Sequence, residues 1–405
     1  MYKSRFTQWG LRKNAKRKGE GDQRPGREKR LIDSFRPLQA EHASYLAPTV
    51  LAKTSRGMPS STPLFHPATT PPMLAIPERI LGVIRDYFRG SFEAGTWLLN
   101  GDERNECRST KPTIPAFAQL SLLYEQTQLA CRHFDRKSFQ DAGKALVSAT
   151  AGIEEIVFAE EPKTLIHLFA IVLDTHHRGR DEIAFAILRQ FSAIAMAVLG
   201  DRHPLCRISG WLSSMDPSRL DDVVDRCLIS VGDHFASHLG PMHNTTLVAR
   251  LESMRDNAEY EEKLRELLGK CENDLGLVDD RTSYVRMALS CTCYDNFKYT
   301  EAKRLGQELV VSSRKLQSTS SKDYYRGAGL YIMAMSQHAL GETQAGELHI
   351  LEAIALISPI VPSRATTWLS ILEDWLQEQG REDAAAETRE RRWKLQESSI
   401  ESDQY

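Results

Sequence analysis

The chain has 405 residues, of which 41% are hydrophobic and 26% are charged, with a formal net charge of -2 at pH 7. This is the composition of an ordinary soluble protein, and it excludes a membrane protein, because no apolar run approaches the roughly 20 residues that cross a bilayer. At this length we expect either several domains or a repeat array whose core grows along one axis.

The charge is unevenly distributed along the chain. Residues 1–36 contain twelve Lys or Arg and four Asp or Glu, so a basic arm precedes an acidic body. Such an arm favours nucleic-acid contact or nuclear import. Charges and aromatic rings also stand where a signal peptide would have its apolar core. We therefore expect the nucleus, with the cytoplasm as the alternative.

A proline-rich stretch follows the arm. Nine of the seventeen prolines lie between Gly21 and Pro77, mixed with Ser, Thr and short basic runs. Such a segment cannot bury enough apolar surface to offset the entropy of ordering it. We predict a basic helix over 1–18 and a disordered linker over 19–76.

A helical neck is predicted over 77–117. Apolar residues recur at helical spacing from Ile80 to Phe88, and Pro77 suits the first turn of that helix. We expect the helix to break near Gly90 and to resume towards Trp97, before a polar loop.

From residue 118 to 395 the helical periodicity continues almost without interruption, and a flexible tail is expected over 396–405. Three stripes of apolar residues illustrate it: Leu165, Leu168, Phe169 and Val172; Ile183, Ile187, Phe191, Ile194 and Val198; Trp368, Leu369, Leu372, Trp375 and Leu376. No comparable stretch alternates with period two. The fold class is therefore predicted to be all-α.

Internal repetition defines the architecture more closely. The segment 199–204, Leu-Gly-Asp-Arg-His-Pro, recurs at 239–244 as Leu-Gly-Pro-Met-His-Asn and more weakly at 275–279. We expect Gly200 and Gly240 to end one helix in a left-handed turn and a polar residue to cap the next. His203 and His243 recur with the repeat, which favours a capping or interhelix contact over metal ligation. Asp216 and Pro217 supply a second helix start between the first two copies, so each repeat has two helices.

The spacing of small residues resembles the tetratricopeptide family. Ala334, Gly341, Gly346 and Ala353 follow one another at intervals of seven, five and seven, as in that pattern. The Leu-Gly-x-x-His turns look like the variant found in kinesin light chains and many fungal repeat proteins. We count five to six helix pairs, and the resemblance implies an α-solenoid that binds a protein partner.

The first fourteen residues resemble a second family. Tyr2, Phe6 and Trp9 would share one face of a helix, and residues 1–14, Met-Tyr-Lys-Ser-Arg-Phe-Thr-Gln-Trp-Gly-Leu-Arg-Lys-Asn, are similar to the end of the fungal cryptic-loci-regulator-five domain. That domain looks like a helix-turn-helix module, whose earlier helices would bury the aromatic face. We expect either an upstream exon or a remnant of the module.

The resemblance assigns roles to the basic residues of this helix. In a complete module Lys3, Arg5 and Gln8 could face a DNA groove, with Arg12 and Lys13 among the residues on phosphates. The nuclear import candidate is made of Arg12, Lys13, Lys16, Arg17 and Lys18.

The remaining candidate sites favour structural roles. Cys291 and Cys293 lack a second cysteine pair at zinc spacing, and the scattered cysteines read as reduced core residues without disulfides. His176 and His177 read as turn residues. Gly143-Lys144 lacks the rest of a phosphate loop. Paired acids such as Glu154-Glu155, Glu160-Glu161 and Asp221-Asp222 read as solvated faces or first-turn charges.

These observations predict no catalytic residue, no metal and no cofactor. The leading hypothesis is a non-enzymatic fungal nuclear regulator whose helical repeats bind an unidentified protein partner, with DNA as a weak possibility for this chain and no membrane. The alternative is a cytoplasmic adaptor of the kinesin-light-chain kind without a nucleic-acid role.

Overall fold

The computed structural model describes residues 72–99, 107–111, 116–254 and 259–402. Over these residues the predicted all-α fold is confirmed, with one short hairpin as an exception. The elements are α2 (Pro72–Glu93), β1 (Trp97–Leu99), β2 (Cys107–Ser109), α3 (Ala116–Asp135), α4 (Phe139–Ala151), α5 (Ile153–Ala159), α6 (Thr164–His177), α7 (Asp181–Leu199), α8 (Pro204–Ser213), α9 (Pro217–Leu239), α10 (Asn244–Met254), α11 (Tyr260–Asp274), α12 (Asp280–Asp295), α13 (Tyr299–Ser313), α14 (Thr319–Ala339), α15 (Thr343–Ile357), α16 (Pro362–Glu378) and α17 (Glu382–Ser402).

One kind of turn recurs inside the helix pairs. Each turn has a residue with positive φ, and a small buried residue follows five positions later in the second helix. The pairs of positions are Lys137 and Ala142, Gly179 and Ala184, Phe297 and Ala302, Gly341 and Gly346, and Gly380 and Ala385. The positive φ reverses the chain, and the small residue lets the second helix pack closely on the first.

A second kind of turn joins one pair to the next at the Leu-Gly repeats. Gly200 and Gly240 both have φ of 92°. The positive φ is as predicted for a left-handed turn. The ψ values of 164° and 156° are extended, however, so these glycines do not adopt the predicted left-handed conformation. Backbone of this kind is open almost only to glycine. Asp216 caps α9 through the amide of Ser218, with Pro217 in the first turn, as the sequence indicates.

Close helix crossings explain the small residues inside helices. A methyl group added to Gly329 in α14 would lie 2.7 Å from the carbonyl oxygen of Gly306 in α13. One added to Gly346 in α15 would lie 3.0 Å from the carbonyl oxygen of Ala334, which is itself fully buried. Ala353, two helical turns after Gly346 on α15, is also fully buried. These five helix positions therefore set how closely α13, α14 and α15 approach.

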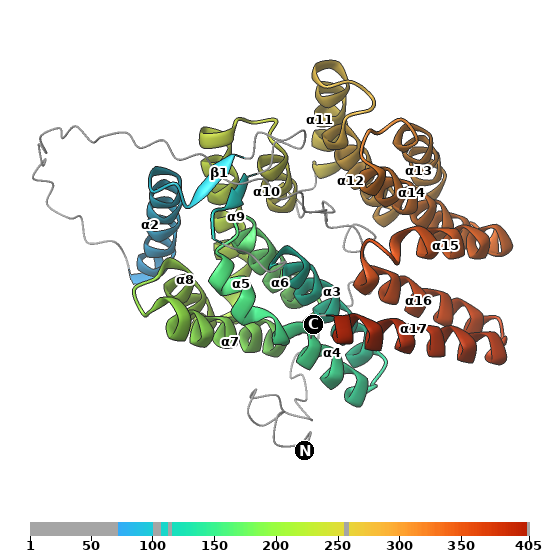
Figure 1. The fold of residues 1–405 in the computed structure, drawn as a ribbon, viewed down its shortest axis with the longest axis horizontal. Helices are drawn as coiled ribbons and strands as arrows, with labels where there is room; N and C mark the ends of the chain where they lie inside the picture. The colour runs from blue at the N-terminus through green and yellow to red at the C-terminus, as the bar shows by residue number, and fades with distance from the viewer. Residues whose placement is uncertain (1–71, 100–106, 112–115, 255–258, 403–405) are drawn as a thin grey trace, which may run out of the picture.

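The helices form two rows. The inner row consists of α3, α6, α10, α12, α14 and α16, which are buried on nearly all sides along most of their length. The helices that follow them, such as α4, α13, α15 and α17, bury mainly one face. In Figure 1 α16 returns to lie beside α3, so the last inner helix contacts the first.

The neck differs from its prediction in three ways. The first helix begins at Pro72, so Pro77 lies inside it, and it continues through Gly90 to Glu93. The chain turns at Gly95, whose φ is 69°. Trp97 then lies in β1, where it pairs with Ser109 of β2, rather than in a resumed helix. Glycine on an exposed helical surface lowers helix stability without ending the helix, which is why Gly90 does not break α2.

The predicted ends of the repeat region also shift. Its first helix, α3, begins at Ala116, and α17 continues to Ser402 through most of the stretch predicted as a tail. The predicted arm and nearly all of the predicted linker lie outside the described residues.

Within the described part of the chain, α7 has the length and apolar composition that would allow it to cross a membrane. The expectation that no apolar stretch approaches that length is therefore wrong for this helix. Ile187 and Phe191 of α7 are buried, and 33% of its apolar stretch is buried inside the structure. Core helices of folded domains meet the same criteria, so the observation is weak evidence for a membrane span.

Candidate functional site: a polar inner row and its ion-pair clusters

The structure can place only part of the predicted site residues. The DNA-binding and import candidates, Lys3 to Lys18, lie outside the described residues. The residues of the two repeat patterns lie at turns or close helix crossings: Gly200, His203, Gly240, His243, Ala334, Gly341, Gly346 and Ala353.

The two repeated histidines have the same local role. Nδ1 of His203 accepts the amide hydrogen of Leu205 at 3.2 Å, and Nδ1 of His243 accepts that of Thr245 at 3.2 Å. Each ring therefore caps the helix that follows it, α8 or α10. Because Nδ1 of His203 accepts, the neutral ring carries its hydrogen on Nε2, which lies 3.0 Å from Glu160 Oε1.

Glu160 is the centre of a buried cluster rather than a solvated charge, so that prediction is wrong. Its carboxylate also binds Lys111 Nζ at 3.0 Å, and its backbone carbonyl accepts the indole hydrogen of Trp97 at 2.8 Å. Burial alone would raise the pKa of Glu160, but the hydrogen bonds from His203 and Lys111 outweigh it and lower that pKa. The sequence shows two adjacent acids at 160 and 161, and only the fold brings hydrogen-bond donors from two other segments to the first.

The same cluster fixes the neck on the repeats. Trp97 packs edge-on against Tyr87 and Phe88 of α2, with ring centroids 5.1 and 5.0 Å apart. Phe92 stacks on His238 of α9 at 4.3 Å. An aromatic seam therefore holds α2 and the hairpin against α8 and α9.

His176 and His177 end α6 and bind different carboxylates. His176 Nδ1 lies 2.7 Å from Asp181, and His177 Nε2 lies 2.7 Å from Asp221 of α9. The two rings thus serve two contacts, which agrees with their interpretation as turn residues.

All seven cysteines are free and buried, in line with their interpretation as core residues. Burial raises the pKa of Cys293 to about 12, and it has the same effect on Cys131 and Cys227. These thiols therefore stay protonated and unreactive at neutral pH.

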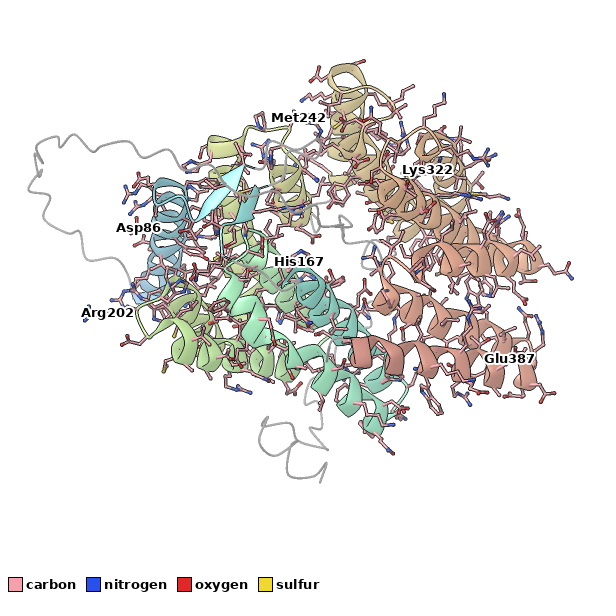
Figure 2. The ribbon with its side chains drawn as sticks, in the orientation of Figure 1. Asp86, His167, Arg202, Met242, Lys322 and Glu387 are labelled. Carbon is pink, nitrogen blue, oxygen red and sulfur yellow. The ribbon has the colours of Figure 1, made fainter. Side chains whose placement is uncertain are left out.

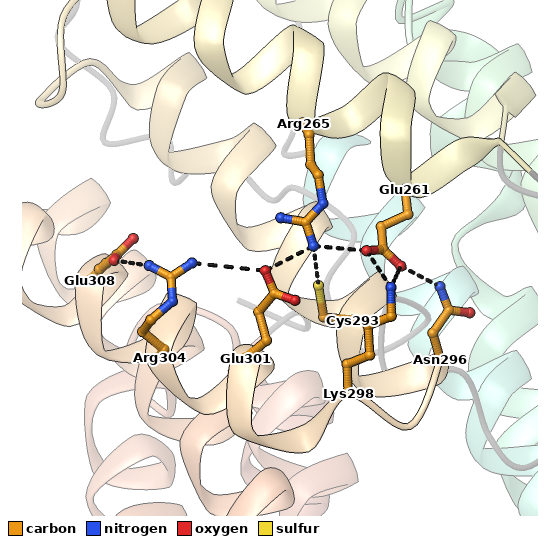
Figure 3. Close-up of polar contacts among 8 residues, drawn as sticks. All are labelled: Glu261, Arg265, Cys293, Asn296, Lys298, Glu301, Arg304 and Glu308. Atoms are coloured by element: carbon orange, nitrogen blue, oxygen red, sulfur yellow. Dashed lines mark hydrogen bonds and ion pairs between the residues drawn. The ribbon is translucent and has the colours of Figure 1, made fainter.

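One group of side chains has the composition of a metal site. Donor atoms of Glu261, Cys293 and Glu301 lie within 4.8 Å of one another, on α11, α12 and α13. Figure 3 shows what lies between them: Nη2 of Arg265 is 2.8 Å from both carboxylates and 3.8 Å from the sulfur. The guanidinium already supplies the positive charge that this group of donors would take.

The neighbouring contacts complete an ion-pair network. Lys298 Nζ and Asn296 Nδ2 both donate to Glu261 at 2.8 Å. Burial would raise the pKa of Glu261, but the hydrogen bonds from Lys298, Arg265 and Asn296 lower it to about 2. The carboxylate therefore stays ionised at neutral pH, and the network joins three helices.

The inner row itself is unusually polar for buried helices. Asp174 of α6 accepts hydrogen bonds from Tyr124 Oη at 2.9 Å and from Gln128 Nε2 at 3.1 Å, both on α3. His167 of α6 lies in the interior of the molecule, whereas Arg202 and Glu387 lie at its periphery (Figure 2). Polar side chains on buried helices give this row hydrogen-bonding capacity as well as apolar surface.

The longest-range contacts of the row join α3 to α16. Glu125 accepts hydrogen bonds from Nε and Nη2 of Arg364 at 3.1 and 3.0 Å, and Nη1 donates to Tyr324 Oη of α14 at 2.6 Å. Sequence reasoning missed these residues, because the pair is separated by 239 positions and neither belongs to a motif.

Comparisons with known proteins add no assignment. No family model matches the chain, and no curated protein matches it.

Proposed function

We propose that this chain is a non-enzymatic scaffold of tetratricopeptide type that holds a protein partner along its inner row. The observation that supports the proposal is the row of six helices, rich in polar and aromatic side chains, in which α3 packs on α6, α6 on α10 and α12 on α14. Stacked helix pairs present an extended surface of this kind, on which a helix or an extended tail binds through apolar anchors and polar rim contacts.

We further propose that the protein is a fungal nuclear regulator of the cryptic-loci-regulator-five type, acting in transcription or chromatin silencing. The resemblance of residues 1–14 to the end of that domain supports this, as does the excess of basic residues over 1–36. The arm would direct nuclear import, and a complete module would add contacts to DNA phosphates.

The alternative is a cytoplasmic adaptor, which the Leu-Gly-x-x-His turns at Gly200 and Gly240 favour. The two functions share the same scaffold and differ in the role of the basic arm. Localisation and DNA binding therefore separate them.

The partner surface is tested by site-specific crosslinking in the full chain. A photoreactive phenylalanine replaces Met335, which is partly exposed on α14 of the inner row, and a matched one replaces Leu348, which is 69% exposed on the outer helix α15. We expect a specific protein to be captured at position 335 and not at 348. Capture of the same protein at 348 alone would exclude the inner row as the binding surface.

The arm is tested by removing residues 1–18. A fluorescent fusion of the truncated chain should lose nuclear accumulation, and unchanged accumulation would argue against an import signal. Full chain and truncation are also compared for DNA binding over a series of salt concentrations. Equal and weak binding by both would favour the adaptor.

A further inference from the structure

The first and last helix pairs of the stack meet at the junction between α3 and α16. In an open solenoid each repeat contacts only its neighbours in sequence. Here Arg132 Nη1 of α3 donates to the carbonyl oxygen of Thr367 at 3.3 Å, across 235 positions. In Figure 1 this junction lies near the middle of the molecule and closes the inner row.

The closing face of α16 is a polar stripe. Arg364, Thr367, Ser370 and Asp374 follow one another three or four residues apart, so they share one side of the helix. Each of them contacts α3 through a hydrogen bond or an ion pair.

The face of α3 that contacts α16 carries charges complementary to those of α16. Glu125 forms an ion pair with Arg364, and the two side chains are 2% and 1% exposed, respectively. One turn beyond Arg132, Arg136 pairs with Asp374 and lies 3.4 Å from the hydroxyl of Ser370. Opposite charges therefore face each other at both the buried centre and the half-exposed rim of the junction.

Junctions between sequence neighbours are built differently. Gly306 of α13 and Gly329 of α14 bring two backbones into direct contact, with Val310 packed beside them. Tyr331 of α14 stacks on Trp368 of α16 at 4.4 Å. Separating these apolar faces exposes hydrocarbon to water, whereas separating charged faces returns the charges to water and recovers part of the energy of the ion pairs.

A long-range contact also lies on the other side of the ring. Arg281 Nη1 of α12 donates at 3.4 Å to the carbonyl oxygen of Met242, in the turn before α10. The chain itself joins the two halves there, so only the α3–α16 junction closes the row without a covalent link.

We infer that the α3–α16 junction is a reversible clasp that closes the inner row into a ring and opens to give access to it. Opening separates the half that contains α3 to α10 from the half that contains α12 to α17. The polar composition of the junction favours opening, because the ion pairs and hydrogen bonds across it can be exchanged for hydration of the same groups. The clasp follows from the contacts alone and does not depend on the partner proposed above.

The test measures the distance between the two sides of the clasp. Spin labels are attached to cysteines that replace Lys144 on α4 and Lys394 on α17, whose side chains are 55% and 72% exposed. The seven native cysteines are buried, so labelling is confined to the new sites. Pulsed electron-spin spectroscopy on the full chain then gives the distance distribution.

The rim pair provides the perturbation. Arg136→Glu places two acids face to face at the clasp, and we expect a second, longer population of distances. Adding Asp374→Arg restores opposite charges, and the distribution should return to its original form. Arg304→Glu, which breaks an exposed ion pair with Glu308 on α13, is the matched control and should leave the distances unchanged.

Two results would overturn the inference. One is a distribution for Arg136→Glu that equals that of Arg304→Glu. The other is a longer population that appears together with a loss of helical circular dichroism, because the halves would then be unfolding rather than separating.

Discussion

Two residues other than glycine, Lys137 and Phe297, hold φ of 61° at the turns inside helix pairs, where Gly179, Gly341 and Gly380 stand in equivalent positions. A side chain at this φ brings Cβ towards the backbone and costs roughly 1–2 kcal/mol. Phe297 is also 63% exposed, so its ring gains little from burial. Local strain is thus stored at two turns of a stack that is otherwise regular.

Replacing Phe297 tests this strain. We expect Phe297→Gly to be more stable than Phe297→Ala by about 1 kcal/mol, because glycine adopts positive φ freely while both variants lose the ring. Urea unfolding of the two variants measures the difference. An alanine variant as stable as the glycine variant would show that the turn is not strained.

His203 is expected to stabilise α8 in two ways, as a helix cap and as a partner of Glu160. His203→Ala removes both and should cost about 2 kcal/mol, whereas His203→Asn keeps a capping side chain and should cost less. Thermal unfolding of both variants gives the comparison. Equal losses would mean that the cap contributes nothing and that the contact with Glu160 is what matters.

At the scale of the elements, helix spacing depends on which glycines lie at a crossing. Gly329 of α14 lies against the backbone of α13, whereas a methyl group at Gly269 of α11 would meet nothing within 4 Å. The two glycines look alike in the sequence, since each stands within a predicted helix. The neighbouring helix alone distinguishes them.

The matched pair Gly329→Ala and Gly269→Ala makes this measurable. The first should destabilise the protein by roughly 1–3 kcal/mol, because the new methyl group would push α13 and α14 apart. The second should stabilise it by about 0.5–1 kcal/mol, since alanine favours a helix interior. Chemical denaturation gives both values, and a loss of stability in both variants would contradict the assignment.

The network around Glu261 joins α11, α12 and α13 and predicts a pH dependence. Because the folded-state pKa of Glu261 is lowered to about 2, its contribution is complete above the unfolded pKa of about 4.3 and is lost as the pH falls through about 2. Wild-type stability should therefore fall more steeply between pH 6 and pH 3 than that of Glu261→Gln. Urea titrations at the two pH values test this, with Glu262→Gln, an exposed neighbour, as the control. If wild type and Glu261→Gln lose the same stability between pH 6 and pH 3, the network does not contribute to the pH dependence.

At the scale of the whole molecule, closure changes how stability is distributed. In an open stack, removal of the last helix pair destabilises only the pair next to it. In this chain α16 also contacts α3, so the stability of each end of the stack depends on the other end.

Deleting residues 362–405 is the test of that dependence. We expect amide hydrogen exchange to accelerate in α3 and α15, two of the helices that contact α16, while α9 keeps its protection because it packs against α2, α6 and α10. Unchanged protection in α3 would show that closure contributes nothing to its stability. Loss of protection in α9 as well would show that the ring unfolds as one unit.

The sequence alone determined the fold class and the positive φ at the Leu-Gly turns. Apolar residues at helical spacing must bury one face, and the positive φ at Gly200 and Gly240 follows from the freedom of a residue without a side chain. Both are local properties, so neighbouring residues suffice to specify them. Local patterns failed at Gly90 and Trp97, where the packing of Trp97 against α2 and α9 decides the structure.

The tertiary structure decided which charges are buried and how the stack ends. Glu160 meets Lys111 and His203, and Glu125 meets Arg364, through helices that are far apart in sequence. No spacing rule connects such residues, because their proximity results from the summed geometry of all the helix crossings between them. The helical pairs are therefore encoded locally, while the closure of the inner row is a property of the assembled chain.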